Sequence, residues 1–200
     1  MIERLDDGRV RIEAPLTGDE VRELHAGDVV LVSGTVYSAR DAAHRRMHEL
    51  LEAGEELPFD PVGQIVYYVG PTPARPGNVT GSAGPTTASR LDRFTPMLLE
   101  RGAKVLIGKG GRGEALRPLF REHVAAYCAA LGGGGALNAR HIRAIEVIAF
   151  EDLGTEAMRR VELEDFPAWV INDSEGRDFY EESQAPWRRD DLLPEGLRRE

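Results

Sequence analysis

The sequence has little cysteine, no excess of basic residues and no long apolar run. Cys128 is the one cysteine among 200 residues. This excludes an internal disulfide and any cluster ligated by cysteines of this chain alone. No segment approaches the roughly 20 apolar residues of a membrane-spanning helix, and the charged residues 1–7 lack the apolar core of a signal peptide. We therefore expect a cytoplasmic protein without a membrane partner and without metal ligands of its own.

The charge balance excludes a further class of partner. The net charge is -9 at pH 7, whereas nucleic-acid binding requires a basic surface that neutralises phosphates. The composition is that of a soluble globular protein, with 42% hydrophobic and 30% charged residues. A chain of this length suits one domain of ordinary size. We expect that domain over residues 1–182, followed by a polar, loosely ordered tail over residues 183–200.

Apolar periodicity predicts a mixture of strands and helices, and therefore the α/β class. Strands are expected over residues 9–14, 28–37, 64–69, 104–107, 124–131, 144–150, 157–163 and 169–172. Helices are expected over residues 21–25, 38–53, 87–100, 114–122 and 137–142. Thr17 and Ser38 are the expected N-caps of the first two helices, and Thr95 caps a second segment after a break at Pro96.

A glycine-rich turn over residues 81–85 leads into Thr86, Thr87 and Arg90. A helix that begins at Thr86 or Thr87 would place Thr86 and Arg90 one turn apart on one face. The free N–H groups of such a helix start, a hydroxyl and a guanidinium together suit a small carboxylate. The alternative is a surface helix with a Ser or Thr cap and a solvated arginine. The local pattern leaves both interpretations open.

A second polar pair lies where a predicted strand gives way to a helix. Arg40 and His44 are four residues apart at the start of the helix over residues 38–53, so they share a face. Such strand-to-helix junctions are common places for binding sites in α/β proteins. The alternative is that His44 is an ordinary surface residue, because the same helix carries three further basic residues.

The loop after residues 104–107 places Lys109 among glycines. Gly108, Gly110 and Gly113 have the spacing of a dinucleotide-binding turn, which would indicate a nucleotide-dependent oxidoreductase. The acidic residue expected about 20 positions later is missing, and Lys109 does not have the spacing of a phosphate-binding P-loop. Nucleotide binding is therefore disfavoured. A lysine where glycines let a ligand approach suits an anion contact, and the alternative is a flexible basic turn.

Several short motifs occur together along the chain. They are Ala14-Pro-Leu-Thr17, Ser33-Gly-Thr-Val-Tyr37, Arg40-Asp-Ala-Ala-His44, Tyr67-Tyr-Val-Gly-Pro71, Gly84-Pro-Thr-Thr87 with Arg90, Gly108-Lys-Gly110, Leu153-Gly154 and Glu164-Asp-Phe-Pro167. In this combination, residues 8–182 resemble the β subunit of the iron–sulfur hydro-lyases, the class I fumarase and L-tartrate dehydratase family. The resemblance implies a single swivelling β/β/α domain, with a mixed sheet and flanking helices.

The resemblance also implies a reaction and a partner. The reaction is reversible addition of water to a small dicarboxylate, as between fumarate and L-malate, and dehydration of L(+)-tartrate is the alternative. The family uses a [4Fe-4S] cluster, held by three cysteines, as a Lewis acid for the substrate hydroxyl. Because this chain has one cysteine, the resemblance implies a partner α subunit that carries the cluster. The enzyme would then be a hetero-oligomer that is active only with that subunit.

Position by position, the resemblance assigns Arg40, Arg90 and Lys109 to the substrate carboxylates, three cations for a dianion. Thr86 matches a hydroxyl proposed to abstract a proton, for which a threonine would need a strong local field. His44 matches a histidine of the tartrate branch, and its side chain suits proton transfer.

The motifs also bear on specificity. Residues 55–58 and 67–73 look more like fumarase β subunits, so fumarate is the first choice of substrate. Arg112 occupies a position that varies among relatives and is expected to affect substrate access or specificity. A module that binds a dicarboxylate without catalysis of its own is the alternative to an enzyme subunit.

Overall fold

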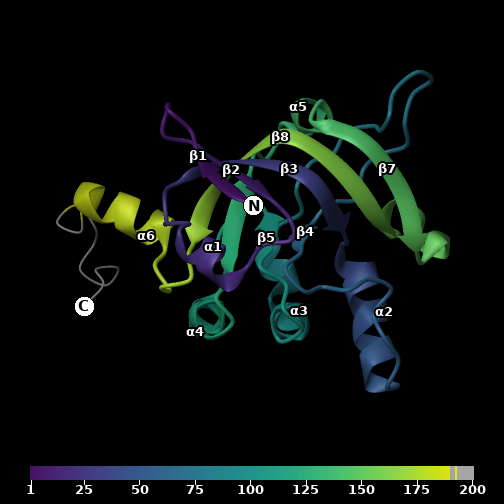
Figure 1. The fold of residues 1–200 in the computed structure, drawn as a ribbon, viewed down its shortest axis with the longest axis horizontal. Coiled ribbons are helices and arrows are strands. Elements are labelled where there is room, and N and C mark those ends of the chain that lie inside the picture. Colours follow the sequence, from purple (N-terminus) through teal and green to yellow (C-terminus); the bar gives the residue numbers. More distant parts are fainter. Residues whose placement is uncertain (190–191, 193–200) are drawn as a thin grey trace.

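The computed structural model describes residues 1–189 and residue 192 (Figure 1). The strands are β1 (Ile2–Arg4), β2 (Val10–Glu13), β3 (Val29–Ser38), β4 (Ile65–Tyr67), β5 (Val105–Gly108), β6 (Ala126–Ala130), β7 (Ile142–Ala149) and β8 (Met158–Asn172). The α-helices are α1 (Gly18–Arg22), α2 (Asp41–Glu52), α3 (Thr95–Leu99), α4 (Arg117–Glu122), α5 (Gly135–Ala139) and α6 (Phe179–Gln184). The 3-10 helices are η1 (Ala88–Phe94), η2 (Glu114–Leu116), η3 (Glu151–Glu156) and η4 (Ala185–Trp187).

Two expectations from the sequence concern the C-terminal tail and membrane-spanning segments. Of the predicted tail, residues 190–191 and 193–200 lie outside the described residues. Within the described part, no helix has the length and apolar character needed to cross a membrane.

In the described part of the chain, eight strands form one mixed sheet that closes on itself. β3, β4, β5 and β6 pair in parallel, in that order. β8 runs antiparallel to both β6 and β3, which completes a ring of hydrogen-bonded strands. β2 and β1 extend the sheet from β3, and β7 extends it from β8. The predicted α/β class, with a mixed sheet and flanking helices, is confirmed.

Side chains of the ring strands alternate between two apolar layers, as the two-residue period of a strand requires. Along β4, Ile65 and Tyr67 belong to the inner cluster, whereas Val66 and Tyr68 belong to the outer one. Helices α2, α3 and α4 lie on one side of the strands (Figure 1) and cover the outer cluster. The ring is therefore a packed core, and polar chemistry is confined to its ends and its helical side.

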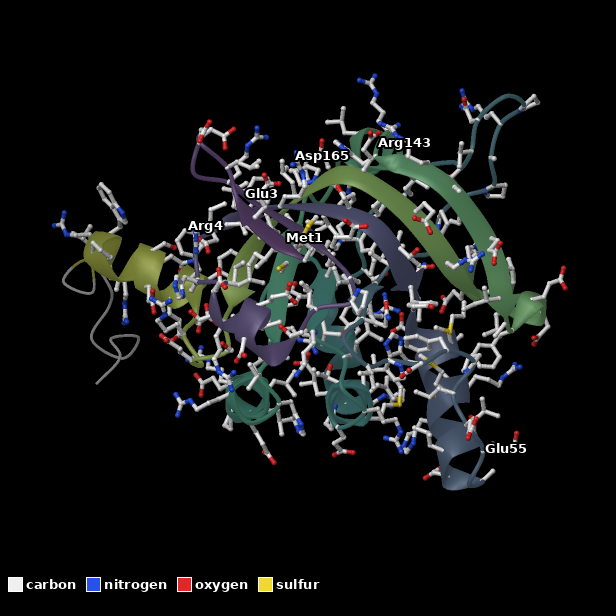
Figure 2. The ribbon with its side chains drawn as sticks, in the orientation of Figure 1. Met1, Glu3, Arg4, Glu55, Arg143 and Asp165 are labelled. Atoms are coloured by element: carbon white, nitrogen blue, oxygen red, sulfur yellow. The ribbon has the colours of Figure 1, made fainter. Side chains whose placement is uncertain are left out.

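The long strand β8 differs from the sequence expectation. Residues 157–163 and 169–172 were expected as separate strands, but one strand runs from Met158 to Asn172. A bulge opposite Ser33 absorbs the irregular segment, where Asp165 has a φ of 49° and its N–H donates to the Ser33 hydroxyl. Arg11 of β2 joins Asp165 to Glu3, and both carboxylates are labelled at the top of Figure 2.

The expected N-caps have different outcomes. The Thr17 hydroxyl and the Glu20 carboxylate form the predicted capping box. Ser38 is not a cap, because its backbone pairs with β4 and β8 as the last residue of β3. The chain therefore enters α2 two residues later, with Arg40 at the N-cap.

The helix expected over residues 87–100 is replaced by two shorter helices. The first seven residues form the 3-10 helix η1, and α3 follows at Thr95. Thr95 does not cap α3, because its hydroxyl donates to the Leu91 carbonyl at 3.0 Å. A break close to Pro96 is thus confirmed, but the proline lies in the first turn of α3, where it needs no backbone N–H.

Candidate functional site

Thr86 and Lys109 are brought together by backbone hydrogen bonds at the end of the parallel strands. The Thr86 N–H donates to the Tyr68 carbonyl at 2.7 Å, and the Lys109 N–H donates to the Thr86 carbonyl at 3.0 Å. The Lys109 carbonyl in turn accepts from Ala88 at 2.9 Å. Gly108 makes this close approach possible, because a Cβ there would lie 3.0 Å from the Ala88 Cβ. The hydroxyl and the lysine therefore stand on adjacent, fixed segments of backbone.

Arg90 connects η1 with the start of α2. Its Nε donates to Asp41 Oδ1 at 3.0 Å, and its Nη2 lies 2.9 Å from Asp41 Oδ2. This two-point pairing fixes the plane of the guanidinium. The Arg90 side chain is 52% exposed, so its outer edge remains open to a ligand.

Arg40 stands at the other side of Asp41. Its Nη2 is 3.7 Å from Glu156 Oε1, and its Nε is 4.0 Å from Asp41 Oδ2. The second Glu156 oxygen accepts from the Ala42 N–H at 2.9 Å, which ties η3 to the first turn of α2. Gly70 leaves room for this arginine, since a Cβ at that position would lie 2.7 Å from Arg40 Cδ.

The internal carboxylates change the expected electrostatics of the site. Asp41 pairs with both Arg40 and Arg90, and Glu156 pairs with Arg40, whereas the exposed Lys109 has no carboxylate partner among the described residues. The three cations are therefore accompanied by two carboxylates, and one unit of positive charge remains. The assignment of these three cations to a dianion stays a prediction, and the two carboxylates reduce the charge that the chain by itself offers to it.

His44 is fully buried rather than at the surface. Its Nδ1 lies 2.9 Å from the Arg40 carbonyl. A carbonyl oxygen only accepts, so Nδ1 carries the proton of the neutral ring. Nε2 is then an acceptor with no hydrogen-bond partner in the described structure. The ring packs against Tyr68 and Phe94, with centroids 5.3 and 6.0 Å away.

These surroundings keep His44 neutral. Burial lowers its pKa from 6.5 to about 4. The Arg40 carbonyl and Asp41 act in the opposite direction, and the positive charge of Arg112 adds to the decrease. His44 is thus an uncharged ring at neutral pH, held behind Arg40 and connected with Thr86 through Tyr68.

At the expected helix N-terminus near Thr86, several backbone N–H groups have partners within the protein. The N–H groups of Thr86, Ala88 and Arg90 donate to the carbonyls of Tyr68, Lys109 and Thr87. Thr87 is bridged to Lys109 just before the 3-10 helix η1, so these three donors are used within the protein. The helix start therefore has fewer free N–H groups for an anion than the sequence suggested.

The loop from Gly108 to Gly113 is also occupied by protein groups. The Tyr127 hydroxyl donates to the Gly110 carbonyl at 2.7 Å, and the Gly113 N–H donates to an Asp92 carboxylate oxygen at 2.9 Å. A dinucleotide-binding turn instead directs its N–H groups at phosphates. The close packing of this loop therefore explains the spacing of its glycines.

Arg112 lies inside the protein, which excludes a direct role in substrate access. Its side chain has no exposed surface, and its Nε is 2.7 Å from Asp92 Oδ1. The guanidinium also donates to the hydroxyls of Tyr68 and Thr95. The expected effect of Arg112 on substrate access or specificity therefore has to act through the residues that it contacts, and it stays a prediction.

Comparison with known proteins assigns the family. The Fumarase C-terminus family matches residues 2–183, nearly the whole chain. The chain belongs to this family. Fumarate hydratase 1, mitochondrial, of Leishmania major is 39% identical to this fumarase C-terminal chain over 153 residues. Fumarate hydratase class I, anaerobic, of Escherichia coli K12 is 36% identical over 153 residues.

The relatives differ in the share of their own length that this chain matches. Each alignment to these two hydratases includes 76% of this chain but 28% of the relative. A proposed L(+)-tartrate dehydratase subunit beta of Methanocaldococcus jannaschii is 35% identical over 173 residues, which are 84% of this chain and 89% of that protein. The chain thus corresponds to the C-terminal part of long relatives and to nearly all of a short one.

The residues of this fumarase C-terminal chain do not fit an iron–sulfur cluster. Cys128 lies in the inner apolar cluster with no exposed surface, where it packs as a small apolar side chain. Burial raises its pKa to about 12, which disfavours the thiolate that iron requires. Among the described residues, no group of three or more His, Cys, Asp or Glu side chains could hold a metal ion.

Two site residues of this fumarase C-terminal chain were missed by sequence reasoning. Asp41 directly follows Arg40 at the start of a helix, and that adjacency was an available signal. Nothing near Glu156 in the sequence marks it as a partner of α2, because η3 reaches Arg40 only through the fold. Both residues determine how the two arginines are held.

Proposed function

We propose that this chain is the β subunit of a two-subunit iron–sulfur hydro-lyase that interconverts fumarate and L-malate. The observation that carries the proposal is the convergence of Arg40, Thr86, Arg90 and Lys109 from four segments at one end of the sheet. The membership of the family and its relatives named fumarate hydratase support the same reaction. The chain supplies one half of the active site.

The arginines and the lysine bind the two substrate carboxylates. Arg90 uses Nε and Nη2 on Asp41, so Nη1 is presented to a carboxylate in a fixed plane. Lys109, exposed and without a carboxylate partner in the described part, provides a second positive contact. Arg40 completes the set from the N-cap of α2. Such contacts strengthen when a closed interface excludes water.

Thr86 and His44 are the proposed groups for proton transfer. Thr86 is 7% exposed and lies on the backbone segment next to Lys109. A threonine hydroxyl needs a positive field to release its proton, and the neighbouring lysine supplies positive charge. His44 stands behind Arg40 as a neutral acceptor through Nε2, and we assign it a larger role if the substrate is tartrate.

The partner α subunit carries the [4Fe-4S] cluster in this proposal. When bound, such a cluster supplies a Lewis acid for the substrate hydroxyl. The proposal places the cluster in the partner because this chain has one thiol and that thiol is buried. The relative with the name subunit beta, which this chain matches over most of its length, supports a hetero-oligomer.

The test is anaerobic co-expression with a three-cysteine α subunit, followed by assays of fumarate formed from L-malate and oxaloacetate formed from L-tartrate. We expect malate turnover that falls by about 100-fold in Arg90→Ala, since charge contacts in such sites contribute factors of this order. Arg93→Ala is the matched control, because Arg93 lies on the same 3-10 helix and its guanidinium stacks on Phe94 instead. Near-normal turnover in Arg90→Ala would remove the site assignment.

The tartrate branch is the second candidate. The alignment with the tartrate dehydratase relative covers 89% of that protein, a better match in length than the long hydratases give. Turnover of tartrate without malate in the same assays would select this branch. A reconstituted complex with an intact cluster that turns over neither would leave a dicarboxylate-binding module, which binding of malate to the chain would then test.

A further inference from the structure

Arg112 is a buried cation that the proposed substrate contacts do not use. Its guanidinium has a partner on three different elements: Asp92 of η1 at 2.7 Å, the Tyr68 hydroxyl after β4 at 3.3 Å, and the Thr95 hydroxyl of α3. The Thr95 hydroxyl in turn donates to the Leu91 carbonyl of η1. One side chain therefore connects the glycine-rich loop with both helical segments.

Aromatic rings complete the surroundings of this guanidinium. The Arg112 Cζ lies 5.1 Å from the centroid of Tyr127, 5.6 Å from Tyr68 and 6.0 Å from Phe120. Arginine over an aromatic face gains from cation–π attraction, which is larger away from water. These contacts suit the planar guanidinium of an arginine better than the ammonium group of a lysine.

The loop that carries Arg112 also carries Lys109. Within it, Gly110 is held through its carbonyl by Tyr127, and Gly113 is held through its N–H by Asp92. Asp92 therefore accepts from Gly113 while it pairs with Arg112. The loop is therefore held at two points. Lys109 is hydrogen-bonded to Thr86 at its start, and Gly113 is hydrogen-bonded to Asp92 of η1 at its end.

The same residue reaches the other half of the site through Tyr68. The Tyr68 carbonyl accepts from Thr86, its hydroxyl accepts from Arg112, and its ring packs edge-on against His44. The Arg112 charge also contributes to the low pKa of His44.

We propose that Arg112 is a positioning residue of the dicarboxylate site. It holds the loop from Gly108 to Gly113 against η1 and α3, and so sets Lys109 and Thr86 in register with Arg90. This inference rests on the proposed function for its catalytic consequence. The geometric consequence, a fixed Lys109, follows from the contacts of the chain itself.

Loss of a residue that positions the loop and loss of a residue that stabilises the whole fold are distinguished by which segments open. Loss of one partner of a buried ion pair destabilises a fold, whereas replacement of both partners by apolar side chains is often close to neutral. Arg112→Met keeps much of the volume but leaves the buried Asp92 Oδ1 without its cation, so part of its effect falls on global stability. We expect the loop, which Arg112 holds, to open more readily still than the sheet, and a site-resolved measurement separates the two effects.

The lysines offer a direct readout in the full chain. Lys104 and Lys109 are the two lysines of the sequence, so lysine-selective ¹⁵N labelling gives two backbone amide signals. The Lys109 N–H donates to Thr86 and the Lys104 N–H donates to Gln64. In Arg112→Met we expect exchange of the Lys109 amide to accelerate at least about tenfold more than that of Lys104, because a local opening of the loop becomes easier.

Arg117→Met is the matched control. Arg117 follows the same loop on α4 and pairs with Asp178 and Glu181, away from the site. Its replacement is expected to leave both lysine amides as in the wild type. Equal acceleration of both amides in Arg112→Met, or no acceleration of either, would overturn the inference.

The second readout is turnover by the complex with the α subunit. A displacement of about 1 Å in a catalytic contact can reduce rates by about 100-fold, and we expect a loss of that order in kcat for Arg112→Ala and Arg112→Lys. Guanidinium chloride at low millimolar concentration, but not sodium chloride, should restore part of the activity of Arg112→Ala by occupying the vacated aromatic site. Full activity of both variants would overturn the inference.

The two proposals fail in different ways. If the wild-type complex turned over neither malate nor tartrate, the proposed function would fall, while the lysine exchange measurement would still decide whether Arg112 fixes Lys109. If the wild-type complex were active and Arg112→Met retained both its turnover and its Lys109 protection, the inference about Arg112 would fall alone.

Discussion

The buried His44 predicts a specific loss of stability in acid. Its pKa is lowered from 6.5 to about 4, chiefly by burial. Between pH 6.5 and about pH 4, His44 is protonated in the unfolded chain but not in the folded chain. The free energy of unfolding therefore falls as the pH falls through this range. Above about pH 6.5 both states are neutral at His44, and the effect vanishes.

The magnitude follows from the pKa difference. Each pKa unit is worth about 1.4 kcal/mol, so at about pH 4.5 this one group reduces the free energy of unfolding by about 2.5 kcal/mol relative to neutral pH. His44→Asn abolishes the titration and keeps a side-chain N–H directed at the Arg40 carbonyl. The packing that this variant loses is the same at every pH and cancels in the comparison.

The assay is urea unfolding of both chains at about pH 7 and about pH 4.5, since the midpoint and slope give the free energy at each pH. The wild type should lose about 2.5 kcal/mol more than His44→Asn between the two conditions. His48→Asn, on the same helix with a side chain that is 51% exposed, should behave as the wild type. Equal losses in wild type and His44→Asn would refute the reasoning.

Three further predictions concern the surroundings of the site. Asp41→Asn frees Arg90 and should raise the KM for the dicarboxylate about tenfold in the complex, with less than about 1 kcal/mol lost in unfolding, because the pair is half exposed. Gly70→Ala forces a Cβ to 2.7–2.8 Å from its neighbours and should cost about 1–3 kcal/mol in urea unfolding, whereas Gly84→Ala, with 3.8 Å available, should be nearly neutral. Cys128 should react with a thiol reagent only as fast as the chain unfolds.

The strands were predictable because their signal is local. The alternation of Ile65, Val66 and Tyr67 between two apolar layers is a property of adjacent residues, and both faces of the ring are covered. The capping box of Thr17 and Glu20 is equally local and was found as predicted. These features specify the elements before any long-range contact forms.

The errors arose where a distant segment overrides a local preference. Ser38 has the chemistry of a cap, but its pairing with Arg159 of β8 and Tyr67 of β4 extends the strand through it. His44 lies on a helix whose other basic residues are exposed, and it is buried because Tyr68 and Phe94 arrive from elsewhere. No window of sequence around either residue contains this information.

The candidate site residues were proposed by type and motif, and that proposal is untested; their charge partners could not be read from the sequence. Arg90 and Lys109 look alike in sequence, as cations next to small residues. In the fold, Arg90 is paired with Asp41 and Lys109 is without such a partner among the described residues. Arg112 shows the same limit, because nothing near it in the sequence indicates that it is buried in contact with Tyr68, Asp92 and Thr95.

Closure of the ring of strands also sets an order of events during synthesis. β3 leaves the ribosome well before its antiparallel partner β8, which runs from Met158 to Asn172. Pairings between such distant segments form slowly and leave strand edges exposed while they wait. The nascent chain therefore carries open edges on β3 and β6 until β8 has been synthesised. The contact between Arg40 and Glu156 joins an early and a late segment in the same way, since Glu156 lies just before β8.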